Sequence, residues 1–148
     1  KYPFPKGRIF EDLYTTYQYY LDAQIVAFVR VSLYYYFQRT DSIMSIRNDT
    51  FITDLIDASN TVVENCQGYG ANVELAAKGK RFSNYCRLLI QPSNLKSHYP
   101  KQYHHIVEIV KKERITVLFD QNARLKNRLA ALALLGGVRC LRLAFKLK

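Results

Sequence analysis

The spacing of apolar residues changes along the chain, and it predicts mostly helices with a short strand-like region near the start. Residues 11–22 carry apolar side chains three or four positions apart, which is the spacing of one face of a helix. These side chains are Leu13, Tyr17, Tyr20 and Leu21. The next residues are β-branched and aromatic, QIVAFV at 24–29 and SLYYYFQR at 32–39. We therefore expect two short strands there, followed by a polar turn over 40–49.

After the turn, the apolar spacing is helical. One helix should end at Gly68 and Gly70, because glycine readily adopts the left-handed conformation that closes a helix. A second runs up to Pro92, and a third begins near Pro100. The run ITVLF in the third helix would also suit a strand, but its place in a helical pattern favours helix. The apolar positions of the three helices are Phe51, Leu55, Ile56, Val62, Val63 and Cys66; Leu75, Phe82, Cys86, Leu89 and Ile90; and Tyr103, Ile106, Val107, Val110, Val117 and Leu118.

The last segment, residues 123–148, alternates leucine and alanine with basic residues and contains no acid. Gly136 and Gly137 should split it into two helices. Its basic residues are Arg124, Lys126, Arg128, Arg139, Arg142, Lys146 and Lys148. Such a segment can lie on an anionic membrane surface. It can equally pack its leucines on the protein's own core while the charges face water, so both interpretations stay open.

Composition narrows the classes of partner. The chain has 148 residues, 49% of them hydrophobic, which suits one domain with a modest core. Its net charge of +10 predicts attraction to a polyanion such as nucleic acid, anionic lipid or a phosphorylated substrate. No nucleic-acid-binding signature accompanies the charge, so we expect no nucleic-acid partner. No apolar stretch reaches the roughly 18 residues of a membrane span, so membrane contact should be peripheral.

The cysteines and histidines do not indicate a metal site in this chain. The cysteine count is odd and no CxxC spacing occurs, which argues against a disulfide framework or a zinc cluster and favours a reducing compartment. The three histidines also lack metal-ligand spacing with nearby acids or cysteines. These residues are Cys66, Cys86 and Cys140, and His98, His104 and His105.

The adjacent acids Glu11 and Asp12, at the start of the first helix, have two interpretations. Carboxylates in a first helical turn accept bonds from unpaired backbone N–H groups and interact favourably with the helix dipole. The same dipole keeps a carboxylate ionised, so that it can take a proton from a bound hydroxyl. Spacing does not separate the two.

Residues 7–44, GRIFEDLYTTYQYYLDAQIVAFVRVSLYYYFQRTDSIM, resemble the acceptor-side segment of bacterial family 2 glycosyltransferases that build surface polysaccharides and glycoproteins. The matching pieces occur in order: a Glu-Asp pair opening a helix, a strand, the run LYYY, and an Arg-x-x-Ser turn. Residues 45–148 resemble the less constrained helical tails of these proteins. The resemblance implies an α+β fold, mainly α with a small β component. Residues 1–49 would be the end of a GT-A catalytic domain, and residues 50–148 a helical domain with a basic amphipathic tail.

The resemblance also implies a reaction, the inverting transfer of a sugar from a nucleotide-diphosphate sugar to an acceptor hydroxyl. Asp12 would be the general base, and Glu11 would support the site. Gln38, Arg39 and Ser42 would lie near the donor diphosphate. Thr40 and Asp41 stand where many relatives have a histidine, which makes a direct role for these two doubtful. Tyr36 would bind substrate, although packing is a competing role for the tyrosines of this stretch.

The nucleotide-binding half of such an enzyme, with an Asp-x-Asp motif for Mn²⁺ or Mg²⁺, would precede residue 1. This chain would then be a carboxy-terminal fragment, inactive and metal-free by itself. The parent enzyme would use a glycan or lipid-linked acceptor and sit at the cytoplasmic face of the cytoplasmic membrane, bound to anionic lipid. Exposed strand edges would permit a homodimer. The alternative is a noncatalytic helical module for membrane docking or interaction.

Overall fold

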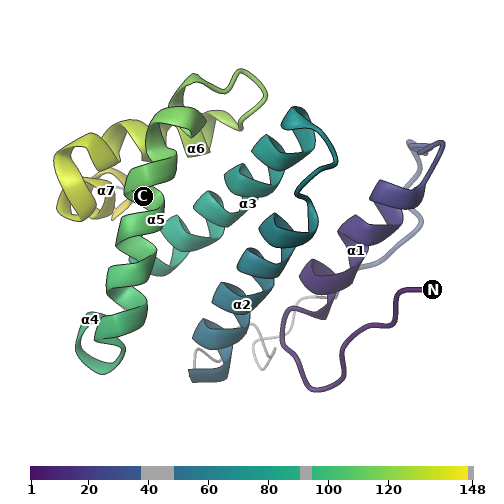
Figure 1. Cartoon of the computed structure of the whole chain (residues 1–148), viewed down its shortest axis with the longest axis horizontal. Coiled ribbons are helices and arrows are strands. Elements are labelled where there is room, and N and C mark those ends of the chain that lie inside the picture. Colours follow the sequence, from purple (N-terminus) through teal and green to yellow (C-terminus); the bar gives the residue numbers. More distant parts are fainter. Residues whose placement is uncertain (38–48, 91–94, 147–148) are drawn as a thin grey trace. The chain divides into compact units, whose positions relative to one another are not determined.

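The computed structural model describes residues 1–37, 49–90 and 95–146, and within these ranges all regular structure is helical (Figure 1). Two compact units divide the chain, Lys1–Val62 and Val63–Lys148. The domain division expected at residue 49 stays a prediction. The elements are α1 (Glu11–Asp22), α2 (Asp49–Asn65), α3 (Ala71–Ile90), α4 (Leu95–His98), α5 (Pro100–Phe119), α6 (Leu125–Ala133), the 3-10 turn η2 (Leu134–Gly136) and α7 (Gly137–Lys146).

The expected α+β fold is wrong, because the described ranges contain no strand. Residues 24–37, where the two strands were predicted, have no regular structure, and residues 38 and 39 lie outside the described residues. Tyr35, for example, is 99% exposed. Strand-forming residues supply only a preference, whereas a strand also needs a neighbour for its backbone N–H and C=O groups. No described segment provides that neighbour, so the GT-A assignment of residues 1–49 has no support in this fold.

The helix predictions are confirmed. α1 has the expected bounds, 11–22, and α2 and α3 follow the expected apolar positions. Gly68 and Gly70, with φ of 82° and 99°, lie between α2 and α3 as predicted. The run ITVLF is the end of α5 and is helical. Gly137, with φ of 88°, separates η2 from α7 and so splits the last segment.

In the first unit, the segment before α1 and α1 itself pack on α2. The rings of Phe10 and Phe51 meet edge to face with centroids 5.0 Å apart, and both side chains are buried. Thr15, one turn into α1, is also buried. Leu55 continues the apolar face of α2 one turn beyond Phe51. The first turn of α1 therefore lies beside a small apolar cluster.

In the second unit, α3 and α5 pack together, and α6 and α7 pack against both each other and α3. Its most deeply buried large side chains are Phe82, Tyr85, Leu89, Leu95, Ile106, Val110, Val117, Leu134 and Leu141. Two basic side chains of the tail bind carbonyl groups near helix ends. Arg128 Nε donates to the Leu118 oxygen of α5 at 3.1 Å, and Arg142 Nε donates to the Leu89 oxygen of α3 at 2.7 Å. Such carbonyls lack partners inside their own helix, so these bonds tie α6 and α7 to the bundle.

Candidate functional site

The start of α1 presents the Glu11-Asp12 pair. Gly7, with φ of 78°, turns the chain ahead of the helix. Phe10 is the N-cap residue, and its buried ring packs on Phe51. Glu11 and Asp12 are the first two helical residues, and both are exposed. A buried anchor thus stands directly before two solvent-facing carboxylates.

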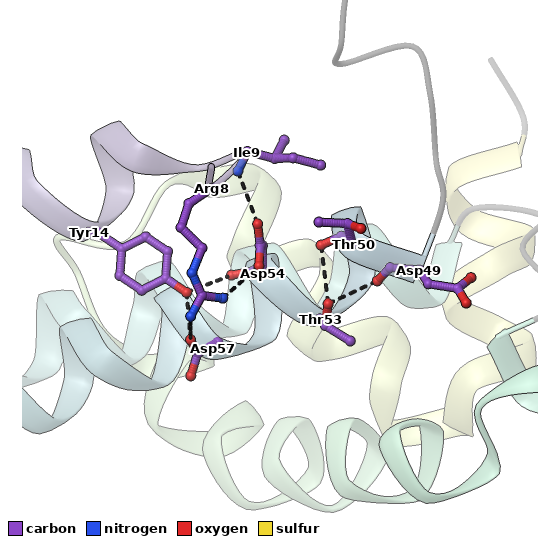
Figure 2. A network of polar contacts seen from close by, with 8 residues as sticks. All are labelled: Arg8, Ile9, Tyr14, Asp49, Thr50, Thr53, Asp54 and Asp57. Carbon is purple, nitrogen blue, oxygen red and sulfur yellow. Dashed lines mark hydrogen bonds and ion pairs between the residues drawn. The ribbon is translucent and has the colours of Figure 1, made fainter. Parts of the chain in front are cut away.

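A polar network between the start of α1 and α2 fixes this geometry (Figure 2). The Asp54 side chain is only 4% exposed. Its Oδ1 accepts a bond from Arg8 Nη1 at 2.7 Å, and its Oδ2 accepts one from the Ile9 backbone N–H at 3.0 Å. Tyr14 donates its hydroxyl proton to Asp57 Oδ2 at 2.7 Å. The chain is therefore held on α2 on both sides of the acid pair.

The network also fixes protonation states. The hydrogen bond to Asp54 raises the pKa of the Arg8 guanidinium, which stays charged. Burial, and then the hydrogen bond to Asp57, raise the pKa of the Tyr14 hydroxyl well above its usual value of 10.0. Tyr14 therefore remains a neutral donor at physiological pH. The network therefore contains a charged guanidinium and a neutral hydroxyl.

The described residues do not show the hydrogen bonds on which the capping interpretation of the acid pair depends. The N-cap of α1 is Phe10, and no side chain caps it. Within the described residues, the carboxylates of Glu11 and Asp12 have no hydrogen bond or ion pair. The helix dipole remains as their favourable interaction with the protein. Both carboxylates are exposed to solvent.

Of the other predicted site residues, only Tyr36 lies in the part of the chain that the structure describes. Tyr36 lies in the irregular segment 24–37 and is 66% exposed. No ring contact or hydrogen bond joins it to α1 in the described part of the chain. Gln38, Arg39 and Ser42 lie outside the described residues, as do Thr40 and Asp41. Among the three predicted site residues that the structure describes, Glu11 and Asp12 lie together at the start of α1, and Tyr36 does not join them.

Sequence reasoning missed Asp54, which is the centre of the network. The sequence could have indicated that Asp54 is buried. It follows Phe51 by three residues and precedes Ala58 by four, which places it on the buried face of α2. A buried carboxylate needs charged or hydrogen-bonding partners. The Arg8 guanidinium and the Ile9 backbone N–H are those partners, and both come from the segment that packs on this face.

The described residues contain neither a group of metal ligands nor a helix that could span a membrane. No group of three or more histidine, cysteine, aspartate or glutamate side chains there is placed to hold a metal ion. His98, His104 and His105 are all exposed. Among the helices described, none combines the length and apolar character that a membrane crossing requires.

Comparison with protein families, curated proteins and solved structures gave no match to this chain. The glycosyltransferase resemblance of residues 7–44 therefore stays a prediction.

Proposed function

We propose that this chain is the acceptor-side portion of an inverting glycosyltransferase of surface polysaccharide or glycoprotein synthesis. The substrates are a nucleotide-diphosphate sugar and the hydroxyl of a glycan or lipid-linked acceptor. The observation that carries the proposal is the Asp12 carboxylate, which is exposed and unpaired within the described residues at the start of a helix anchored through Asp54. The ordered motifs of residues 7–44 supply the reaction class.

In this reaction Asp12 is the general base. Its carboxylate accepts the proton of the acceptor hydroxyl as the hydroxyl oxygen attacks the anomeric carbon. A new carbon–oxygen bond forms there, and the bond to the diphosphate breaks on the opposite face, so that the diphosphate leaves with the electron pair. The positive end of the α1 dipole interacts favourably with the Asp12 carboxylate. Glu11 supports the site from the adjacent position.

The donor side is assigned to other residues. Arg39 neutralises charge on the leaving diphosphate, Gln38 and Ser42 donate hydrogen bonds, and Tyr36 contacts substrate. A divalent metal, Mn²⁺ or Mg²⁺, belongs to the nucleotide-binding part of the parent enzyme. The described residues do not supply a ligand set for it. The 148-residue chain alone is proposed to be inactive.

The deciding experiment is Asp12→Asn in the enzyme that contains this chain together with the sequence encoded upstream. Asparagine keeps the size of the side chain but removes its basicity, so turnover should fall by about 10²- to 10⁴-fold. The melting temperature should change little, because the carboxylate makes no hydrogen bond in the described structure. Glu11→Gln is the matched control, and it should lose much less activity. Near-normal turnover of Asp12→Asn would refute the assignment of the base.

A further inference from the structure

Helix α6 buries two of its three alanines and exposes all of its leucines. Ala130 and Ala131 are 4% and 0% exposed. The exposed fractions of Leu125, Leu129 and Leu132 are 69%, 51% and 51%. This is the reverse of the usual preference, because a leucine gains more free energy from burial than an alanine does. The leucines of α6 therefore face away from the core of their own unit.

The three leucines form one stripe. Successive helical residues are rotated by about 100°, so Leu125, Leu129 and Leu132 fall within an arc of about 60°. We call them the leucine stripe. Ala130 and Ala131 lie on the opposite side of the helix. Lys126 and Arg128 lie roughly 70–90° to either side of the stripe, so a basic residue flanks it on each side.

The charged side chains of α6 and α7 all have one sign. No aspartate or glutamate occurs after Asp120 in the sequence. Arg124, Lys126 and Arg139 are exposed. Arg128 and Arg142 each donate one N–H group to a helix carbonyl and keep their positive charge. An apolar stripe between basic side chains matches the boundary between acyl chains and anionic headgroups, where the leucines enter and the long basic side chains reach outward.

We propose that the leucine stripe and its flanking basic residues dock the protein on an anionic lipid surface. A nucleic acid would satisfy the charges but has no apolar phase to receive the leucines, whereas a charged bilayer satisfies both. This proposal is independent of the glycosyltransferase proposal, because it uses neither residues 7–44 nor any sugar.

The test is sedimentation of the full chain with vesicles. Binding is expected to vesicles of phosphatidylglycerol mixed with phosphatidylcholine, to weaken as salt rises, and to be absent with pure phosphatidylcholine. Equal binding to both vesicle types, or to neither, overturns the proposal. A double-stranded DNA duplex serves as a second polyanion. If replacing the leucines weakens binding to the duplex as much as it weakens binding to anionic vesicles, the proposal is overturned.

Two sets of variants separate the apolar and the ionic contributions. Leu125→Gln, Leu129→Gln and Leu132→Gln together should weaken vesicle binding by about tenfold or more, since the apolar insertion is lost. The matched control is Phe4→Gln, Tyr20→Gln and Tyr69→Gln, three residues outside the tail whose side chains are 53%, 61% and 55% exposed, which should leave binding unchanged. Equal losses in the two triple variants contradict a role for the stripe.

Arg124→Gln with Lys126→Gln should weaken vesicle binding by about 25-fold, at roughly fivefold for each charge near the surface. Lys80→Gln with Lys101→Gln removes the same charge from exposed positions on α3 and α5 and should cost clearly less. Circular dichroism of each variant verifies that the helices remain.

The chain has no tryptophan, which permits a direct reading of insertion. Leu129→Trp places an indole in the stripe, and its emission should shift to shorter wavelength with anionic vesicles. Tyr69→Trp, at a residue 55% exposed outside the tail, is the control and should not shift. An unshifted emission of Leu129→Trp under conditions where the protein sediments with vesicles refutes insertion of the stripe.

Discussion

Asp54 is the buried charge that connects the start of α1 to α2. Its two oxygens accept bonds from a guanidinium and from a backbone N–H, so both leave the network if the side chain is removed. Asp54→Ala should lower the free energy of unfolding of the first unit by about 2 kcal/mol, the typical value for hydrogen bonds to a charged group. Urea unfolding, followed by circular dichroism, measures the change.

Asp57→Ala is the control for that substitution. Asp57 is 54% exposed and accepts from the Tyr14 hydroxyl, so its loss should cost less than about 1 kcal/mol. If the two variants unfold at the same urea concentration, burial of Asp54 is not what stabilises the start of α1.

At the residue scale, the sequence identified the exposed half of the candidate site and missed the buried half. Glu11 and Asp12 were predicted because adjacent acids at a helix start are visible in one dimension. Asp54 lies 46 positions from Arg8, and a contact over that separation has no local pattern. The roles of Gln38, Arg39 and Ser42 stay predictions.

At the scale of elements, α3 and α5 share a buried ion pair between Arg81 and Glu113. The Glu113 side chain is 7% exposed, and its Oε2 has no hydrogen-bond partner within the described structure. Arg81 Nε donates to the other oxygen, Oε1, at 3.2 Å. Burial raises the pKa of Glu113 above its ordinary value of 4.5, although the Arg81 hydrogen bond opposes the shift.

A pH dependence of stability follows from this raised pKa. Between the unfolded-state and folded-state values the folded protein holds more protons, so the contribution of Glu113 is present at lower pH and is lost as pH rises through the folded-state pKa. Glu113→Gln cannot ionise and should therefore gain stability relative to the parent as pH rises above 4.5. Thermal unfolding at a series of pH values checks this.

Glu108→Gln, at an exposed residue of the same helix, is the control and should show no such trend. A stability difference between Glu113→Gln and the parent that is constant with pH would mean that Glu113 titrates alike in the folded and unfolded states.

Helices were predictable from sequence where a period of apolar residues extended over several turns. The run ITVLF favours strand by composition, yet it belongs to a helix whose buried residues include Val110 and Val117. The strand prediction for residues 24–37 was wrong, because these residues have strand-forming side chains but no neighbouring strand in the described ranges. A helical period of apolar residues indicates which face of a segment packs on the rest of the chain. A strand-forming composition alone does not indicate whether a neighbouring strand exists. The exposure of the α6 leucines was likewise left open by their spacing.

At the scale of the whole molecule, residues 24–37 expose a continuous apolar stretch with a single charge, Arg30. The expected homodimer was to form through strand edges, and the described residues contain none. The stretch itself still favours self-association, since its five aromatic side chains alone present on the order of 800 Å². That is close to the roughly 800 Å² which each partner buries in a typical stable interface. We predict a concentration-dependent dimer, measured by sedimentation velocity.

Val29→Lys with Leu33→Lys should shift this equilibrium to monomer, because charges in the middle of the stretch oppose pairing. Gln67→Lys with Asn72→Lys adds the same charge at exposed polar positions and should leave the dimer intact. Equal dissociation by both variants would assign the effect to net charge.

The contacts of Arg8 and Tyr14 with α2 close a loop that includes residues 24–37. In a flexible chain the entropy lost on closing a loop grows only with the logarithm of its length, so doubling the connector costs about 0.6 kcal/mol. We therefore expect the first unit to tolerate changes in the length of this connector with little loss of stability. We therefore expect the apolar residues of 24–37 to serve contacts with other molecules rather than the stability of the first unit.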